Sequence, residues 1–299
     1  MTPPASLRSA ALVTLLLLGA TVSESALPKD SREGSELSVR YSQTGTSDLE
    51  AAGPAGSVAV DSFQLGVRAG TPLTDATRLL YGVDWTDHRL DLPGRRWLPE
   101  RLQAVALPLG VAHRWDERWQ LLATLQPRLA SAGSILSSSS LDVPVMVLGN
   151  YTATPELAWT FGLRYGARSD IKVLPIAGVV WRFAPEWDFR LAWPDSGLSY
   201  RATPQLTLRA VATFHGGDYR LAEDPRAPAD RNGASLDHAW LEYREVRVGL
   251  AAEYNVGRGV NLRAGFGQVV GQRFAYLDRG LRLKGETPAY FALGAVARF

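Results

Sequence analysis

The chain has 299 residues, of which 32 are basic and 30 acidic, so its formal net charge of +2 gives no sign of a nucleic-acid partner. It contains no cysteine, which excludes disulfides, catalytic thiols and thiolate metal sites. Glycine (28), tyrosine (10) and tryptophan (9) are plentiful, whereas 4 histidines are too few for a metal-binding profile. We therefore expect no metal and no other cofactor.

Residues 1–25 have the pattern of a secretory signal peptide. Arg8 precedes an apolar run over residues 10–19. The small residues Ser23 and Ser25 follow, separated by one residue, as signal peptidase requires. An uncleaved membrane anchor is the alternative, but the apolar run is well short of the ~20 residues of a spanning helix. We expect cleavage, export and a single mature domain of residues 26–299.

The mature sequence alternates with period 2. In residues 157–166, large apolar side chains such as Phe161 and Leu163 share one parity, and small or charged ones such as Gly162 and Arg164 share the other. Residues 246–256 repeat the pattern. A face of apolar residues backed by small and polar ones is typical of a strand between lipid and a lumen. A soluble periplasmic β-protein is an alternative that leaves the apolar outer faces unexplained.

Tight turns alternate with longer polar loops along the chain. The turns lie near residues 115–118, 154–156, 184–186, 203–205 and 257–259, and the loops near 45–56, 88–100, 131–141, 217–236 and 272–287. Short turns at one end and long loops at the other are typical of transmembrane β-barrels. The count is about fourteen strands, with twelve or sixteen open: near 36–44, 57–69, 77–87, 101–114, 119–130, 142–152, 157–167, 172–183, 187–194, 197–202, 206–216, 237–256, 260–271 and 288–299. The predicted fold is all-β, a single antiparallel up-and-down barrel.

The segment 237–256 is longer than a membrane strand needs. Trp240, Glu242 and Arg244 fall on its outward parity, and lipid would not tolerate the two charges. We expect this end of the strand to project beyond the membrane, although a bulge or an extra hairpin would also fit.

The chain ends in Phe299, on the apolar parity of its last predicted strand. Trp119 and Trp187 follow short turns, and Trp85 and Trp193 lie toward opposite strand ends, as two interfacial aromatic girdles would require. With the signal peptide and the repeated Thr-Pro and Ala-Pro turns, this ending resembles bacterial outer-membrane β-barrels. Residues 174–181, followed by 187–194, are similar to a porin-like family of unknown function. The resemblance implies a Gram-negative outer membrane, contact with the lipid bilayer and lipopolysaccharide, and Phe299 as a signal to the barrel assembly machinery. It implies no activity.

Arginine is the most distinctive residue on the inward parity. Arg182 and Arg190 flank one short turn and Arg201 and Arg209 flank another, which predicts a basic wall near the periplasmic mouth, with Arg164 and Arg263 on the same lumen face. Arginine forks suit phosphate and carboxylate groups, so the wall favours a passive pore for small solutes, with a preference for anions. The structural alternative is that these arginines fill the lumen and pair with acidic side chains such as Asp188 and Glu253.

Two further classes of function stay open. A closed barrel with a structural or surface-interaction role would need no open lumen. An outer-membrane enzyme would need a nucleophile with a base, and no serine accompanies His88, His113, His215 or His238 in the pattern of outer-membrane phospholipases. We expect the histidines to be ordinary residues of the rim and no enzymatic site.

Overall fold

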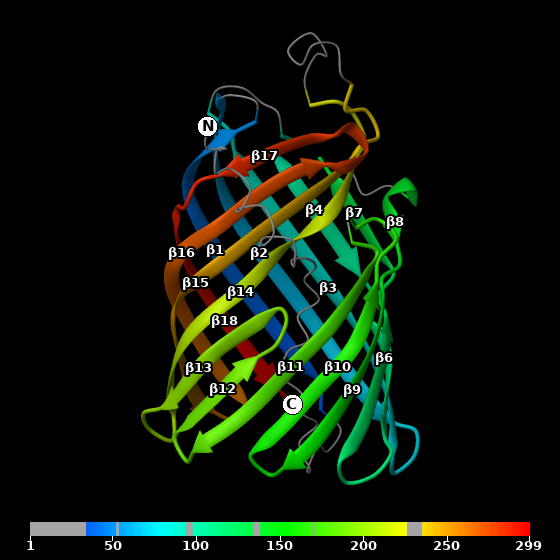
Figure 1. The fold of residues 1–299 in the computed structure, drawn as a ribbon, viewed down its shortest axis with the longest axis vertical. Coiled ribbons are helices and arrows are strands. Elements are labelled where there is room, and N and C mark those ends of the chain that lie inside the picture. The colour runs from blue at the N-terminus through cyan, green and yellow to red at the C-terminus, as the bar shows by residue number, and fades with distance from the viewer. Residues whose placement is uncertain (1–33, 52–53, 94–97, 134–137, 170, 226–234) are drawn as a thin grey trace, which may run out of the picture.

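A computed structural model describes residues 34–51, 54–93, 98–133, 138–169, 171–225 and 235–299, and the expected signal peptide lies outside these ranges. Figure 1 shows one barrel of antiparallel strands, with the C-terminus at the end that carries the short turns. No helix among the described residues is long and apolar enough to cross a membrane.

Eighteen strand segments form the wall. They are β1 (Glu36–Glu50), β2 (Pro54–Pro72), β3 (Thr77–Asp91), β4 (Arg101–Ala106), β5 (Leu109–Arg114), β6 (Trp119–Leu125), β7 (Arg128–Ala132), β8 (Leu141–Asp142), β9 (Val145–Thr154), β10 (Leu157–Tyr165), β11 (Val173–Ala184), β12 (Trp187–Leu191), β13 (Asp195–Arg201), β14 (Leu206–Leu221), β15 (Trp240–Gly257), β16 (Val260–Tyr276), β17 (Leu281–Gly285) and β18 (Ala289–Arg298).

Proline accounts for the difference between eighteen segments and fourteen strands. Pro108, Pro127, Pro144 and Pro288 lie in the interruptions between β4 and β5, β6 and β7, β8 and β9, and β17 and β18. Proline has no N–H to donate to a neighbouring strand, so the ladder breaks there. The flanking segments continue along the same neighbours: β3 pairs with both β4 and β5, and β16 with both β17 and β18. The prediction of fourteen strands is confirmed.

The first and last strands close the barrel. β1 pairs with β18 from Glu36 opposite Arg298 to Thr44 opposite Tyr290, and with β2 on its other edge. The predicted tight turns all join strands at the end where β1 begins and β18 finishes, and the longer connections lie at the other end. In outer-membrane barrels the short turns are periplasmic, so we call the two ends periplasmic and outer.

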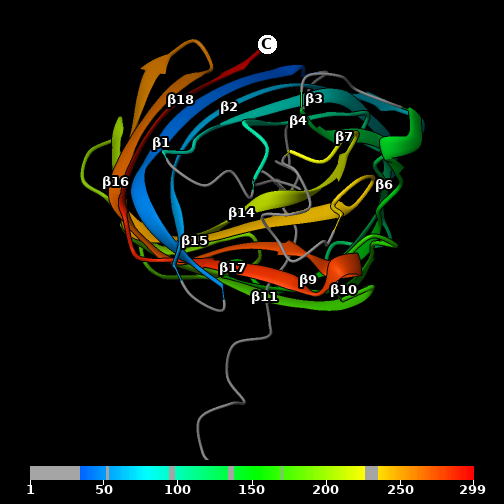
Figure 2. The same cartoon turned by 90° about the horizontal axis from the view of Figure 1, so that it is seen from above.

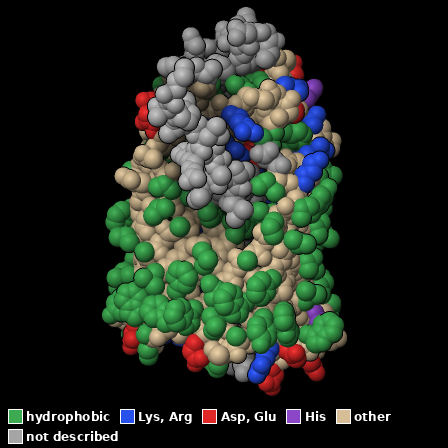
Figure 3. Space-filling view, viewed as in Figure 1, with side chains coloured by type: hydrophobic (Ala, Val, Ile, Leu, Met, Phe, Trp, Pro, Cys, Tyr) green, Lys and Arg blue, Asp and Glu red, His purple; other side chains and the backbone are tan. Residues whose placement is uncertain are grey.

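The wall has the predicted apolar outer surface. Leu163 is 56 % exposed, whereas Arg164, the next residue of β10, is 4 % exposed. Apolar side chains gather over the visible wall in Figure 3. Near the short turns, Trp187 of β12 contacts the rings of Phe183 and Tyr200 on neighbouring strands, with ring centroids 6.3 and 4.7 Å apart. This row is the periplasmic aromatic girdle that the sequence predicts.

The prediction for residues 240–244 is wrong. Instead of projecting outward, Trp240, Glu242 and Arg244 are 8, 1 and 7 % exposed. The outer halves of β14 and β15 leave the wall and cross the barrel interior (Figure 2). We call residues 216–221 and 240–245 the inward arm.

Pairing defines the course of the inward arm. The periplasmic half of β14 pairs with the short strand β13, as far as Thr213 opposite Asp195. Beyond that point β14 pairs in parallel with β7, Arg220 opposite Ser131 and Leu221 opposite Ala132. Because β8 to β13 separate β7 from β14 around the wall, this contact spans the interior. The charges on the outward parity of β15 therefore face protein, not lipid.

Gly216 marks the point where the inward arm departs. Its φ is +135°, a conformation that side chains other than hydrogen disfavour. A Cβ there would also clash with the carbonyl oxygen of Tyr243. The bend thus depends on glycine at this position.

A hydrophobic core fills the outer end of the barrel. The inward arm contributes Tyr219, Leu221, Leu241 and Tyr243, and the surrounding wall contributes side chains from β1 to β4, β7, β16 and β17, including Leu49, Val58, Val60, Leu90, Leu102, Ala130, Phe274, Tyr276 and Leu283. Tyr243 stacks on Phe274 with ring centroids 4.8 Å apart. An apolar core replaces an open outer mouth among the described residues, so the hollow part of the lumen lies on its periplasmic side.

Candidate functional site

Three arginines of the predicted basic wall lie near the periplasmic end, on the strand face opposite exposed apolar neighbours such as Trp181 and Phe183. Arg182 of β11 and Arg201 of β13 are exposed, and Arg190 of β12 is half-buried. Register places Val180 opposite Arg190 and Ser199 opposite Arg209, so the arginines that flank each turn are diagonal neighbours and not directly opposed. Diagonal placement reduces the repulsion between like charges on adjacent strands.

Arg209 and Arg263 lie deeper and share two carboxylates. Arg209 donates to Asp195 at 3.1 Å and to Glu253 at 2.9 Å, and its side chain is 7 % exposed. Arg263 reaches the same two carboxylates only at 3.5 Å. Asp195 and Glu253 therefore neutralise Arg209 closely and Arg263 loosely.

Arg164 does not join the periplasmic wall. It is buried near the outer end of β10, beside Gly166 and Ser169. No ion pair joins it to another described residue, and its Nη1 has no hydrogen-bond partner there. The six arginines singled out from the sequence thus form three groups: Arg182, Arg190 and Arg201 at the periplasmic end, Arg209 and Arg263 in mid-lumen, and Arg164 near the outer end.

A cavity of about 190 Å³ occupies mid-lumen, below the apolar core. Arg40, Arg128, Arg247 and Arg263 are its basic lining residues, and Asp84 and Asp195 its acidic ones. Glycine and alanine, including Gly66, Gly265 and Gly294, make up much of the wall between them. Because these inward-facing residues have small side chains, the lumen stays hollow at this level.

Arg40 differs from the other basic residues of the cavity. Arg128 pairs with Asp218 at 3.2 Å, Arg247 with Glu245 at 2.8 Å and Arg263 with Asp195 at 3.5 Å. Arg40 makes only a long hydrogen bond, 3.5 Å from its Nη1 to the amide oxygen of Gln64, and no described carboxylate lies within ion-pair distance of it. Its charge is the one left uncompensated in the cavity lining.

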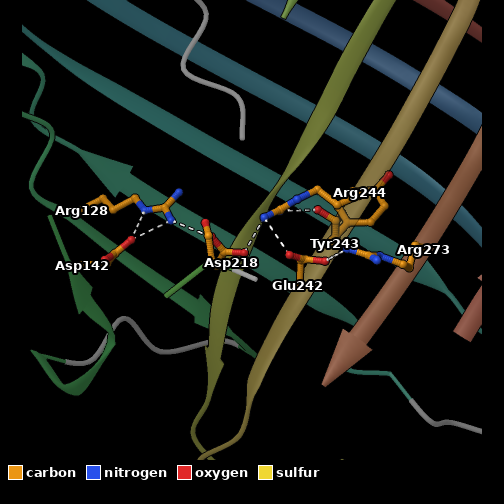
Figure 4. Close-up of polar contacts among 8 residues, drawn as sticks. Arg128, Asp142, Asp218, Glu242, Tyr243, Arg244 and Arg273 are labelled. Atoms are coloured by element: carbon orange, nitrogen blue, oxygen red, sulfur yellow. Dashed lines mark hydrogen bonds and ion pairs between the residues drawn. The ribbon is translucent and has the colours of Figure 1, made fainter. Parts of the chain in front are cut away.

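A chain of buried ion pairs holds the inward arm to the opposite wall (Figure 4). Arg128 of β7 donates to Asp142 of β8 at 2.9 Å and to Asp218 of the arm at 3.2 Å. Arg244 of the arm donates to Asp218 at 2.6 Å and to Glu242 at 3.2 Å, and Arg273 of β16 completes the chain through Glu242. Three arginines thus balance three carboxylates, which is the condition under which buried charges are tolerated.

Sequence reasoning missed this chain of ion pairs. Arg128 and Asp218 are 90 residues apart, and nothing local predicts that β7 and β14 meet. The available signal was the misplaced charge itself, Glu242 and Arg244 on the lipid parity of a long strand.

His88 is buried and does not lie at the rim, so the expectation of a rim residue is wrong for this histidine. The Ser62 hydroxyl lies 2.7 Å from His88 Nδ1, but the two side chains are 5 and 2 % exposed. The His88 ring is packed against those of Tyr219 and Tyr243, with centroids 6.0 and 5.3 Å apart. A substrate has no access to this pair. Within the described ranges, no three His, Asp or Glu side chains come together as metal ligands would.

A family model for a domain of unknown function, DUF6268, matches residues 88–287. The chain belongs to the DUF6268 family. That match covers the strands from the end of β3 to β17, and therefore the inward arm, its ion pairs and the predicted basic wall. No curated protein sequence matches the chain.

Solved structures of outer-membrane channels have a similar fold. The COG4313 outer membrane channel from Pseudomonas putida F1 is 13 % identical, with 92 % of this chain and 99 % of that chain covered and a TM-score of 0.50. The toluene transporter TodX of P. putida is 11 % identical, with 90 and 91 % covered and a TM-score of 0.52. At such identity the comparison shows the fold alone, a closed barrel of the outer-membrane type.

Proposed function

We propose that this DUF6268 protein is an outer-membrane channel for small anionic solutes. The observation that carries the proposal is arginine on the inward parity with no described carboxylate partner: Arg40 lines the cavity, and Arg182 and Arg201 are exposed near the periplasmic end. Guanidinium groups attract and bind carboxylate and phosphate oxygens, so such a lumen favours anions over cations. The apolar outer belt supports placement in a bilayer, with lipopolysaccharide at the outer leaflet.

Export and assembly belong to the same proposal. Residues 1–25 direct export and are cleaved. Phe299, which is 75 % exposed at the end of the outward parity of β18, serves as the signal to the assembly machinery. Its main-chain N–H donates to Ser35 O at 3.0 Å, which ties the residue to the chain just before β1.

Planar-bilayer recording of the refolded mature chain under a salt gradient tests the channel. We expect conductance steps with a reversal potential of anion-selective sign. Replacing Arg182, Arg190 and Arg201 with glutamine should shift that potential toward zero. The matched control replaces Arg89, Arg118 and Arg258, three exposed arginines outside the lumen, and should leave it unchanged. An unchanged potential in the lumen variant would refute the role of the basic wall.

A closed barrel is the second candidate, and the apolar core at the outer end favours it. A correctly folded, heat-modifiable protein that never conducts would establish this alternative. The role would then be structural or that of a surface for interaction.

A further inference from the structure

We propose that the mid-lumen cavity is a binding site for a single small oxyanion, a carboxylate or phosphate group, with Arg40 and Arg263 as its two basic ligands. This inference rests on the proposed function, because it names the place in the lumen where an anionic solute would bind. The site is built by strand register, which places the two arginines on either side of a glycine.

One row of inward-facing residues crosses four neighbouring strands. Gln64 of β2 is opposite Arg40 of β1, Arg40 is opposite Gly294 of β18, and Gly294 is opposite Arg263 of β16. Neighbouring strands lie 4.7–4.9 Å apart, so the Cα atoms of the two arginines are about 10 Å apart. Two long side chains based at that distance can reach a common ligand above the strand between them.

Gly294 provides the floor of the site. It lines the cavity, as do its neighbours Ala292 on the same strand and Gly265 on β16. With no side chain at Gly294, the space between the two guanidinium groups stays free. A large residue at this position would fill the place of the ligand.

The local charge balance leaves one positive charge for a ligand. Arg209 and Arg263 face Asp195 and Glu253, two against two, and Arg68 pairs with Asp84 at 3.1 Å. Arg40 has no described carboxylate partner, and Arg263 is held only at 3.5 Å. A bound monoanion would neutralise Arg40 and give both arginines a short charge-assisted contact.

Binding is measured directly, without reliance on transport. Isothermal titration calorimetry of the refolded protein in detergent, at constant ionic strength, uses inorganic phosphate and, separately, acetate as probes. We expect saturable binding of at least one probe, weakened about 10- to 100-fold in Arg40→Gln, since a hydrogen bond to a charged group contributes on that order.

Two further variants keep the test specific. Arg164→Gln removes the same charge from another arginine that has no ion pair with a described residue, but outside the cavity lining, and should bind like the wild type. Gly294→Leu keeps every charge and fills the floor, and should abolish binding while heat modifiability confirms the fold. Equal binding by wild type and Arg40→Gln, or equal loss in Arg164→Gln, would overturn the site.

The channel and the site can fail separately. Saturable, Arg40-dependent binding by a protein that does not conduct would support the site and refute the channel. Anion-selective conductance with no saturable binding would support the channel and refute the site.

Discussion

Asp218→Asn should release the inward arm from the wall. Asp218 is 1 % exposed and accepts from Arg128 at 3.2 Å and from Arg244 at 2.6 Å, so its loss leaves two buried guanidinium groups short of a negative charge. Removing one partner of a buried ion pair costs about 3–5 kcal/mol. Each 1.4 kcal/mol is a factor of ten, so the equilibrium constant for opening the arm should rise roughly 100- to 3,000-fold.

Hydrogen exchange measured by mass spectrometry reads this equilibrium. Main-chain amides of residues 217–221 should lose protection by that factor, whereas amides of residues 207–213, in the wall section of β14, should keep theirs. Glu36→Gln is the control: it breaks the Glu36–Arg298 pair at the periplasmic rim, 3.0 Å long and partly exposed, and should cost no more than about 1 kcal/mol. If Asp218→Asn leaves the protection of 217–221 within a few-fold of the wild type, the ion pairs do not hold the arm.

Three further changes test the outer core, the bend and the C-terminus. Gly216→Ala should destabilise the barrel by at least about 1–3 kcal/mol in urea unfolding, because alanine disfavours φ near +135° and its Cβ would clash with the carbonyl oxygen of Tyr243. The control is Gly280→Ala, which should destabilise the barrel less, because Gly280 has φ +65° and open space around it. Phe274→Ala should cost about 3–5 kcal/mol in the same assay, since its buried ring stacks on Tyr243; a loss under 1 kcal/mol would contradict a tightly packed outer core. Deleting Phe299 should reduce the amount of assembled barrel in outer-membrane fractions with little change in the stability of the protein that does assemble, and normal assembly would contradict its role as a signal.

The wall could be predicted from sequence because its determinants are local. Period-2 alternation specifies which side of each strand meets lipid, and turns such as residues 184–186 specify where strands reverse. The four prolines that divide strands did not change the count, because the chain resumes along the same neighbours beyond each break. The short hairpin β12–β13 is also present, although its reversal lies at residues 192–194 and not at 195–196.

The interior could not be predicted in the same way, because its determinants are distant in sequence. The inward arm follows from the bend at Gly216 and from contacts between β14 and β7, 90 residues apart at the Arg128–Asp218 pair. Arg40 and Arg263 are distinguished from other arginines on the inward parity only by pairing across β18 and by where the carboxylates lie. Glu242 and Arg244 do lie on the parity of the lipid-facing residues of β15, but local sequence does not reveal that protein covers that face of the strand here.

In the proposed channel, the two halves of the barrel have separate roles, closure on the outer side and anion selection on the periplasmic side. On the outer side, charges are balanced three against three and lie beside a dry core, which favours one fixed arrangement of the arm. On the periplasmic side, Arg40, Arg182 and Arg201 lack described carboxylate partners, and Arg40 lines the cavity, which is why we propose an anion there. Arg128 and Arg247 belong to both, since they line the cavity and pair with Asp218 and Glu245 of the arm. Variants at Arg40 should change affinity while the amides of the arm keep their protection, and variants at Asp218 should do the reverse.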